Sequence, residues 1–191
     1  MKTRSVGAVL LAWSFSDAAP AAGAPEPLLP VRVVKPPVID GVLNDEAWTT
    51  APFVTGFKTW LPDFGKDMTE RTKAYYAYDR ENLYFAFRCF DSEPGQIKTS
   101  ISSRDNIRSD DWIAIHLDSF NDQQSAYTFY INPMGIQADS RFAAGIEDIG
   151  FDAVWYSAGT LDEEGFKVEV RIPFKSIRYA NTDRLEMGIL F

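Results

Sequence analysis

The sequence has few of the residues that build covalent or metal-centred sites. Its 191 residues include one cysteine, Cys89, and one histidine, His116. A single cysteine excludes an intrachain disulfide, and the apolar run around Cys89 indicates a buried, small hydrophobic side chain. The Cys/His spacings of zinc sites, glycine-rich phosphate loops and EF-hand patterns are all missing from the sequence. Zinc-finger, P-loop and EF-hand proteins are therefore excluded.

A catalytic pattern is also missing. A Ser-His-Asp or Cys-His centre would have to use His116, which lies in the middle of a predicted strand without an oriented nucleophile. A glycosidase needs two carboxylates at a fixed separation, and nothing selects such a pair among the 27 acidic residues. We therefore expect a protein that is not an enzyme. Glycoside hydrolase activity would belong to a downstream part of a longer polypeptide.

Positive charge is scarce. The sequence has 19 basic and 27 acidic residues, for a net charge of −8. An acidic domain repels the phosphate backbone of nucleic acids, and it has no electrostatic attraction to anionic lipids. The composition therefore predicts no nucleic-acid partner.

No apolar run is long enough for a membrane-spanning helix, which needs about 20 residues. Near the N-terminus, Lys2 and Arg4 precede a short apolar run at 6–15, and small residues with an A-x-A site follow it. This arrangement predicts a signal peptide at 1–24, followed by a Pro-rich linker at 25–30. We therefore expect an exported protein, located in the periplasm, in the outer membrane or outside the cell.

Aromatic residues and short strand patterns are abundant. Aromatics make up 14% of the chain, and they favour strands because they pack well on a pleated surface. Strands are predicted at 31–34, 69–78, 83–90, 112–118, 126–132, 137–142, 154–160, 166–172 and 185–191. One or two short helices are predicted, at 45–49 and 174–179. Residues 31–191 therefore predict an all-β domain, an antiparallel, jelly-roll-like β-sandwich. The apolar last strand predicts a domain truncated at its C-terminus.

Two oxygen-rich loops are candidates for calcium. Asp118, Asn121 and Asp122 form one, and Asp148 and Asp152 contribute to the other. Calcium takes six to eight oxygen ligands from loops of this kind. Asn and Asp also favour ordinary turns, so a purely structural role stays open.

Four sequence runs together resemble the family 9 carbohydrate-binding modules. They are PVIDGVLNDEAW at 37–48, YDRENLY at 78–84, DDWIAIHLD at 110–118 and GFKVEVRIPF at 165–174. The similarity is closer to a bacterial group in which such a domain follows a signal peptide and precedes an outer-membrane β-barrel-like region. Arg104-Asp105-Asn106, Asn132-Pro133-Met134-Gly135 and Trp155 fit that group.

The resemblance implies a β-sandwich that binds sugar, with calcium stiffening its loops. Sugar-binding members clamp the ligand between two tryptophans. At the first clamp position this sequence has Arg108, and the second would lie beyond Phe191. A glutamate expected in the following strand is replaced by Ala114, and an arginine expected in the next strand is replaced by Tyr130. The resemblance therefore predicts the fold more firmly than the sugar site.

Three functions remain open. The first is a carbohydrate-binding accessory domain in polysaccharide metabolism, with candidate binding residues Trp60, Arg104, Asp105, Arg108, Trp112 and Tyr130. The second is a docking domain for a membrane-embedded β-barrel in the same chain, without a sugar ligand. The third is a haem-binding sandwich, with His116 and either Met134 or Met187 as axial ligands.

Overall fold

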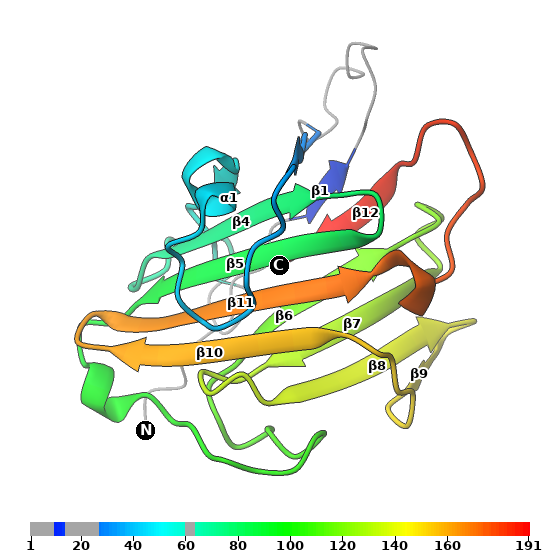
Figure 1. Cartoon of the computed structure of the whole chain (residues 1–191). Helices are drawn as coiled ribbons and strands as arrows, with labels where there is room; N and C mark the ends of the chain where they lie inside the picture. Colours follow the sequence, from blue (N-terminus) through cyan, green and yellow to red (C-terminus); the bar gives the residue numbers. More distant parts are fainter. Residues whose placement is uncertain (1–9, 14–26, 60–63) are drawn as a thin grey trace.

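The structure is a computed structural model that describes residues 10–13, 27–59 and 64–191. Two sheets pack face to face, as the front and back layers of Figure 1. In spatial order, the front sheet contains β10 (Tyr156–Asp162), β11 (Gly165–Pro173), β5 (Asn82–Phe90), β4 (Thr72–Tyr78) and β2 (Val31–Arg32), and β3 (Phe53–Val54) also pairs with β4. The back sheet contains β1 (Leu10–Trp13), β12 (Met187–Leu190), β6 (Ile113–Asp118), β7 (Ser125–Ile131), β8 (Gln137–Ala143) and β9 (Ile146–Asp148).

The predicted antiparallel sandwich is confirmed, with small differences. Each predicted strand is present, and the predicted first helix is α1 (Glu46–Thr50). The segment predicted as a second helix forms only the 3-10 turn Phe174–Ser176, and a further 3-10 turn spans Pro94–Gln96. All strand pairs are antiparallel except β2 with β4. No described helix is long and apolar enough to cross a membrane.

The predicted signal peptide at 1–24 lies largely outside the described residues. Within it, β1 is described and pairs with the outer edge of β12, from Leu10 opposite Leu190 to Trp13 opposite Met187. The signal peptide and the linker at 25–30 stay predictions.

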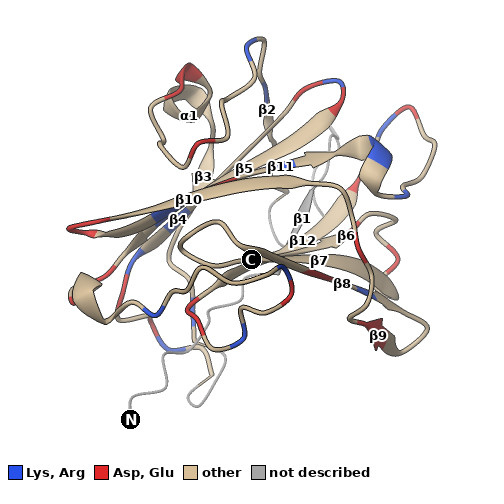
Figure 2. Cartoon of the chain, turned by 60° about the horizontal axis from the view of Figure 1, so that its bottom comes forward, with Lys and Arg blue, Asp and Glu red and all other residues tan. Residues whose placement is uncertain are grey.

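The main core lies between the two sheets. Phe85 and Phe87 of β5 and Val168 of β11 face Ile115 of β6 and Phe129 of β7, and each is at most 2% exposed. Because side chains alternate along a strand, the residues between these positions point away from the core. Each sheet therefore has an outer face, and both outer faces carry polar and aromatic groups. Figure 2 shows that most charged segments lie on turns and loops rather than along the sheets.

A second, smaller apolar cluster covers the outer face of the front sheet, where Trp48 of α1 packs near Tyr84. Glu169 of β11 points into this cluster and is fully buried. Its Oε1 accepts a hydrogen bond from Trp48 Nε1 at 2.6 Å. Its Oε2 accepts hydrogen bonds from the backbone N–H groups of Asp40 (3.1 Å) and Gly41 (2.8 Å). The sequence runs at 37–48 and 165–174 therefore meet in one hydrogen-bonded cluster that holds α1 on the sheet.

At the free edge of the front sheet, β10 touches the turn between β7 and β8 through glycines. An ideal Cβ added to Gly159 would lie 2.4 Å from the carbonyl oxygen of Pro133, and one added to Gly135 would lie 2.7 Å from the Gly159 nitrogen. Ser157 Oγ donates to the Gly135 carbonyl at 2.7 Å. Backbone therefore packs directly on backbone here, and a side chain at either glycine would separate the two segments.

Candidate functional site

The outer face of β6, β7 and β8 brings together aromatic and polar side chains. Trp112 precedes β6, and because side chains alternate along a strand, Trp112, Ala114 and His116 lie on the side opposite the buried Ile115 and Leu117. The register sets Tyr130 of β7 opposite Ala114, and Thr128 opposite His116. We call this surface the β6–β8 face; its defining residues are Trp112, Ala114, His116, Thr128, Tyr130, Ser140 and Glu147.

Three rings form a row on the β6–β8 face. The ring centroids of Trp112 and Tyr130 are 5.3 Å apart at an interplanar angle of 84°, and those of His116 and Tyr130 are 6.2 Å apart at 81°. Edge-to-face contacts of this kind stabilise aromatic pairs beyond simple burial. All three side chains are partly exposed. The row is therefore ordered by its own contacts and still reaches solvent.

Polar groups lie along the same row. His116 Nδ1 and Thr128 Oγ1 are 3.0 Å apart, and Ser140 Oγ donates to Glu147 Oε1 at 2.7 Å. Burial, together with the negative charge of Glu147, raises the pKa of Tyr130. The Tyr130 hydroxyl therefore keeps its proton at neutral pH. Thr128 and Ser140 are buried, so the groups that reach solvent beside the aromatic rings are the Tyr130 hydroxyl, the His116 imidazole and the Glu147 carboxylate.

His116 is expected to titrate below its usual range. Burial lowers the pKa of His116 from 6.5, and the charge of Glu147 opposes this shift. The unfolded chain therefore binds a proton at His116 more readily than the folded protein does. The stability that His116 contributes as a neutral ring is fully present above pH 6.5, and it is lost as pH falls through the folded-state pKa. NMR titration of the single histidine should give a midpoint below 6.5. A midpoint at or above 6.5 would contradict the burial of the ring, and a His116→Asn variant should lack this part of the pH dependence of stability.

A cavity of about 350 Å³ adjoins the β6–β8 face at the start of β6. Trp112 and Ala114 belong to both, and most of the remaining lining is apolar, including Phe57, Phe87 and Phe191. Cys89 also lines the cavity, and burial raises the pKa of its thiol to about 12. The thiol is therefore protonated and unreactive at neutral pH, as its apolar neighbours in the sequence predict.

Asp110, in the loop before β6, also lines this cavity. Ser100 Oγ donates to Asp110 Oδ2 at 2.8 Å, and Asn132 Nδ2 donates to the same oxygen at 2.7 Å. The first Asp of the Asp-Asp-Trp run and the Asn of the Asn-Pro-Met-Gly turn therefore hold two loops together. Asp110 and Asn132 therefore have a structural role in the sequence runs to which they belong.

Arg104 and Asp105, two of the predicted binding residues, lie away from the β6–β8 face. Arg104 pairs with Asp139 of β8, and its Nη1 donates to Gln137 Oε1 at 2.5 Å. Gln137 and Asp139 alternate with Ser140, so they point to the opposite side of the sheet. Asp105 has a φ of 68°, and its Oδ1 accepts the backbone N–H of Asp139 at 3.4 Å. In this structure both residues fix the 104–105 loop to β8.

The other predicted binding residues divide between the site and its surroundings. Trp112 and Tyr130 are neighbours in the aromatic row. Arg108 is exposed in the turn before β6, close in sequence to the cavity end of the site. Trp60 lies outside the described residues.

The predicted calcium ligands are engaged in a turn. Asp118 Oδ2 accepts the backbone N–H of Gln123 at 2.7 Å, and Asp122 Oδ1 accepts that of Gln124 at 2.8 Å. Asn121 is exposed, with a φ of 53°. Within the described ranges, no three or more His, Cys, Asp or Glu side chains are grouped closely enough to hold a metal ion. The two carboxylates stabilise the loop between β6 and β7 through these hydrogen bonds, and calcium binding stays a prediction.

The geometry does not fit haem between His116 and Met187. His116 points outward from β6, whereas Met187 belongs to the main core and is 1% exposed. The two side chains therefore lie on opposite faces of the back sheet and cannot ligate one iron. Met134 lies in the exposed turn after β7. The prediction of a His116–Met187 haem site is wrong, because the alternation of facing residues separates the two ligands.

The whole arrangement has the topology of a known family of binding domains. The sequence model described as "Carbohydrate family 9 binding domain-like" matches residues 39–191. The chain belongs to this family. No curated protein sequence matches the chain.

Solved structures share the fold of this family 9 domain. A family 9 carbohydrate-binding module from Caldicellulosiruptor kristjanssonii in complex with cellotriose has a TM-score of 0.54 at 18% identity, covering 84% of this chain and 83% of that chain. A complex of such a module with glucose, from the same organism, gives 0.55 at 18% identity, covering 83% and 84%. A Bacteroides uniformis protein gives 0.62 at 11% identity, covering 84% and 80%. At these identities the similarity establishes the fold alone.

Sequence reasoning missed the polar half of the β6–β8 face in this family 9 domain. Thr128, Ser140 and Glu147 come from three successive strands, and their convergence depends on register rather than on any local motif. Ala114 and Tyr130, which depart from the residues expected by resemblance, are paired directly across β6 and β7. The ring of Tyr130 thus occupies the surface where the resemblance implied a glutamate and an arginine.

Proposed function

We propose that the β6–β8 face binds an oligosaccharide without catalysing a reaction. The observation that carries this proposal is the Trp112–Tyr130 pair, which lies beside hydrogen-bonding groups and an adjoining, largely apolar cavity. A pyranose ring presents C–H groups on its faces and hydroxyls around its rim. Aromatic surface suits the first and polar side chains suit the second.

Family membership and fold support the same proposal. Two of the structurally similar modules are complexes with cellotriose and glucose. We therefore propose neutral glucans as the first ligands to test. Export of the protein and a part in polysaccharide breakdown are further proposals, and they rest on the sequence pattern at 1–24 and on the family.

Trp112→Ala and Tyr130→Ala are expected to weaken oligosaccharide binding by roughly fivefold each, because each removes a stacking surface with a contribution on the order of 1 kcal/mol. Isothermal titration with cellotriose and with other neutral oligosaccharides measures the effect. Tyr179→Ala is the matched control, because Tyr179 is an exposed aromatic that packs on Phe174 at 5.5 Å, away from the β6–β8 face.

Binding that is unchanged in Trp112→Ala and Tyr130→Ala would place the sugar elsewhere and refute the proposed face. Absence of heat with every neutral and acidic glycan would refute carbohydrate binding itself. In that case the docking function predicted from the sequence would be the one to pursue.

A further inference from the structure

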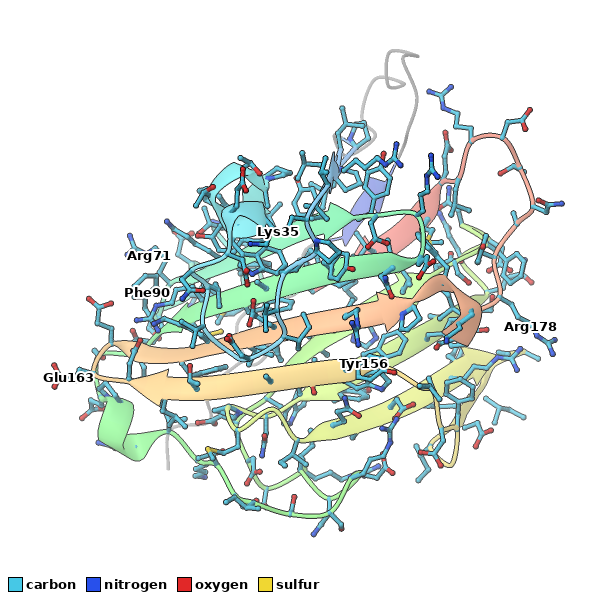
Figure 3. All side chains as sticks on the ribbon, viewed as in Figure 1. Lys35, Arg71, Phe90, Tyr156, Glu163 and Arg178 are labelled. Atoms are coloured by element: carbon cyan, nitrogen blue, oxygen red, sulfur yellow. The ribbon has the colours of Figure 1, made fainter. Side chains whose placement is uncertain are left out.

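A second pocket, of about 510 Å³, lies at the edge of the sandwich where β10 of the front sheet meets the start of β8, away from the β6–β8 face. The segment 37–39 forms one wall, and Tyr156 and Arg171 form another. The register sets Tyr156 of β10 opposite Arg171 of β11, and Arg171 opposite Tyr84 of the outer cluster. Figure 3 shows Tyr156 at the front of the β10–β11 layer. We call this site the Arg171 pocket.

The Arg171 pocket is positively charged in a protein with a net charge of −8. Arg171 is the only charged residue among those that line it. In the described part of the chain, no carboxylate lies within ion-pair distance of Arg171, although Arg88 and Arg104 both have carboxylate partners. The nearest carboxylate along the same face of β11 belongs to Glu169, which already accepts three hydrogen bonds.

The guanidinium of Arg171 is held in place by a ring. Its Cζ lies 4.0 Å from the centroid of Tyr156, a stacking distance that favours both the cation and the planar group. The Arg171 Nε is shielded from solvent and has no hydrogen-bond partner among the described residues. A buried donor without a partner costs free energy, and an acceptor in the pocket would remove that cost.

A second unused donor lies at the same pocket. Trp155, which is 4% exposed, lines it, and its Nε1 also has no hydrogen-bond partner within the described residues. Two other polar side chains are engaged, since Gln137 Nε2 donates to Ser157 Oγ at 3.0 Å and Ser157 Oγ donates to the Gly135 carbonyl. The hydroxyl of Tyr156, which also lines the pocket, can donate or accept a hydrogen bond. The unpartnered nitrogen donors of Arg171 and Trp155, together with the charge of Arg171, favour an anionic ligand that accepts hydrogen bonds.

We propose that the Arg171 pocket binds a carboxylate, carried by a uronic acid unit of an acidic glycan or by a free organic acid. The planar guanidinium matches a carboxylate in a two-point hydrogen bond, and Tyr156 provides a stacking surface beside it. This site lies at the β10 edge of the front sheet, whereas the β6–β8 face is the outer face of the back sheet. The outcome of a test of the Arg171 pocket is therefore independent of the function proposed for the β6–β8 face.

The test is isothermal titration of the whole chain with four probes: trigalacturonate, the neutral galactotriose, sodium acetate and sodium phosphate. Trigalacturonate is expected to bind, and its affinity should fall as salt is added. Weak acetate binding alone would identify a free organic acid as the source of the carboxylate. Galactotriose binding that is as tight as trigalacturonate binding and equally weakened by Arg171→Gln would overturn the proposal. Phosphate binding more tightly than either carboxylate probe, or no binding by any carboxylate probe, would also overturn it.

Arg171→Gln should weaken carboxylate binding by roughly tenfold to a hundredfold, since it removes the charge from the hydrogen bonds. Arg71→Gln is the matched control, because Arg71 stacks on Phe90 at 4.3 Å, and Figure 3 shows both at the opposite end of the front sheet. If Arg171→Gln fails to fold, Tyr156→Leu leaves the arginine in place and should still weaken binding severalfold. Equal affinity in wild type and in the folded variants would overturn the proposal.

Discussion

Replacing Glu169 by alanine is expected to lower the free energy of unfolding by about 3 kcal/mol or more. The substitution leaves the Trp48 Nε1–H and the backbone N–H groups of Asp40 and Gly41 without their shared acceptor. Each buried donor left without a partner costs about 1–3 kcal/mol, less what local relaxation recovers. Chemical denaturation followed by tryptophan fluorescence measures the loss.

Glu169→Gln distinguishes the contribution of the negative charge to stability from that of the hydrogen bonds. The amide keeps one acceptor oxygen but turns an NH₂ group toward a donor, so a loss of about 1–2 kcal/mol is expected. Glu163→Ala, at the exposed tip of the β10–β11 hairpin in Figure 3, is the matched control and should change stability by less than about 0.5 kcal/mol. Equal stability of Glu169→Ala and Glu163→Ala would refute a structural role for this carboxylate.

The ionisation of Glu169 also makes the free energy of unfolding depend on pH. Burial raises the pKa of Glu169 above 4.5, and the hydrogen bonds from Trp48 and the two backbone amides oppose this shift. The folded state therefore binds this proton more tightly than the unfolded state. The resulting contribution to stability is full below pH 4.5 and is lost as pH rises through the folded-state pKa. The stability advantage of wild type over Glu169→Gln should accordingly shrink as pH rises across that interval.

Gly165→Ala is expected to destabilise the protein by about 3 kcal/mol. An ideal Cβ at this position would lie 2.1 Å from the carbonyl oxygen of Cys89, and the residue has a φ of 137°. The added methyl group therefore meets both steric overlap with backbone and an unfavourable conformation. Thermal and chemical unfolding of the variant measure the loss.

Gly145→Ala isolates the conformational part of this effect. Gly145 also has a positive φ, 80°, but nothing lies within 4 Å of an added Cβ. Its substitution should cost about 1 kcal/mol, from backbone strain alone. If the Gly165 and Gly145 variants lose the same stability, the close approach of β11 to the carbonyl of Cys89 is not significant for the fold.

The sandwich was predictable because its strands alternate clearly. The pattern of Ile113, Ile115 and Leu117 identifies the buried side of β6 without any knowledge of its neighbours. Three described strands escaped prediction, β1, β3 and β9. β3 and β9 have two and three residues, too few to show a period, and β1 lies in the apolar run interpreted as part of a signal peptide.

The candidate site was only partly predictable, because its contacts depend on distant residues. Trp112 and Tyr130 were expected as exposed aromatics, and the pairing of β6 with β7 makes them neighbours. Arg104 was expected at the site, but its partner Asp139 lies 35 positions away and holds it on the other side of the sheet. Glu169 alternates with the apolar residues of β11, and its burial arises from a segment more than 120 positions earlier in the chain.

The glycine contact between β10 and the turn before β8 has a consequence for recognition. Backbone packed on backbone has no rotamers to rearrange, so the edge that carries Trp155, Tyr156 and Ser157 moves as one unit with the turn at Gly135. The wall of the Arg171 pocket formed by this edge is thus already in its final shape before a ligand arrives. A preformed wall loses little conformational entropy on binding, and affinity there depends on the fit of the ligand rather than on the ordering of the protein.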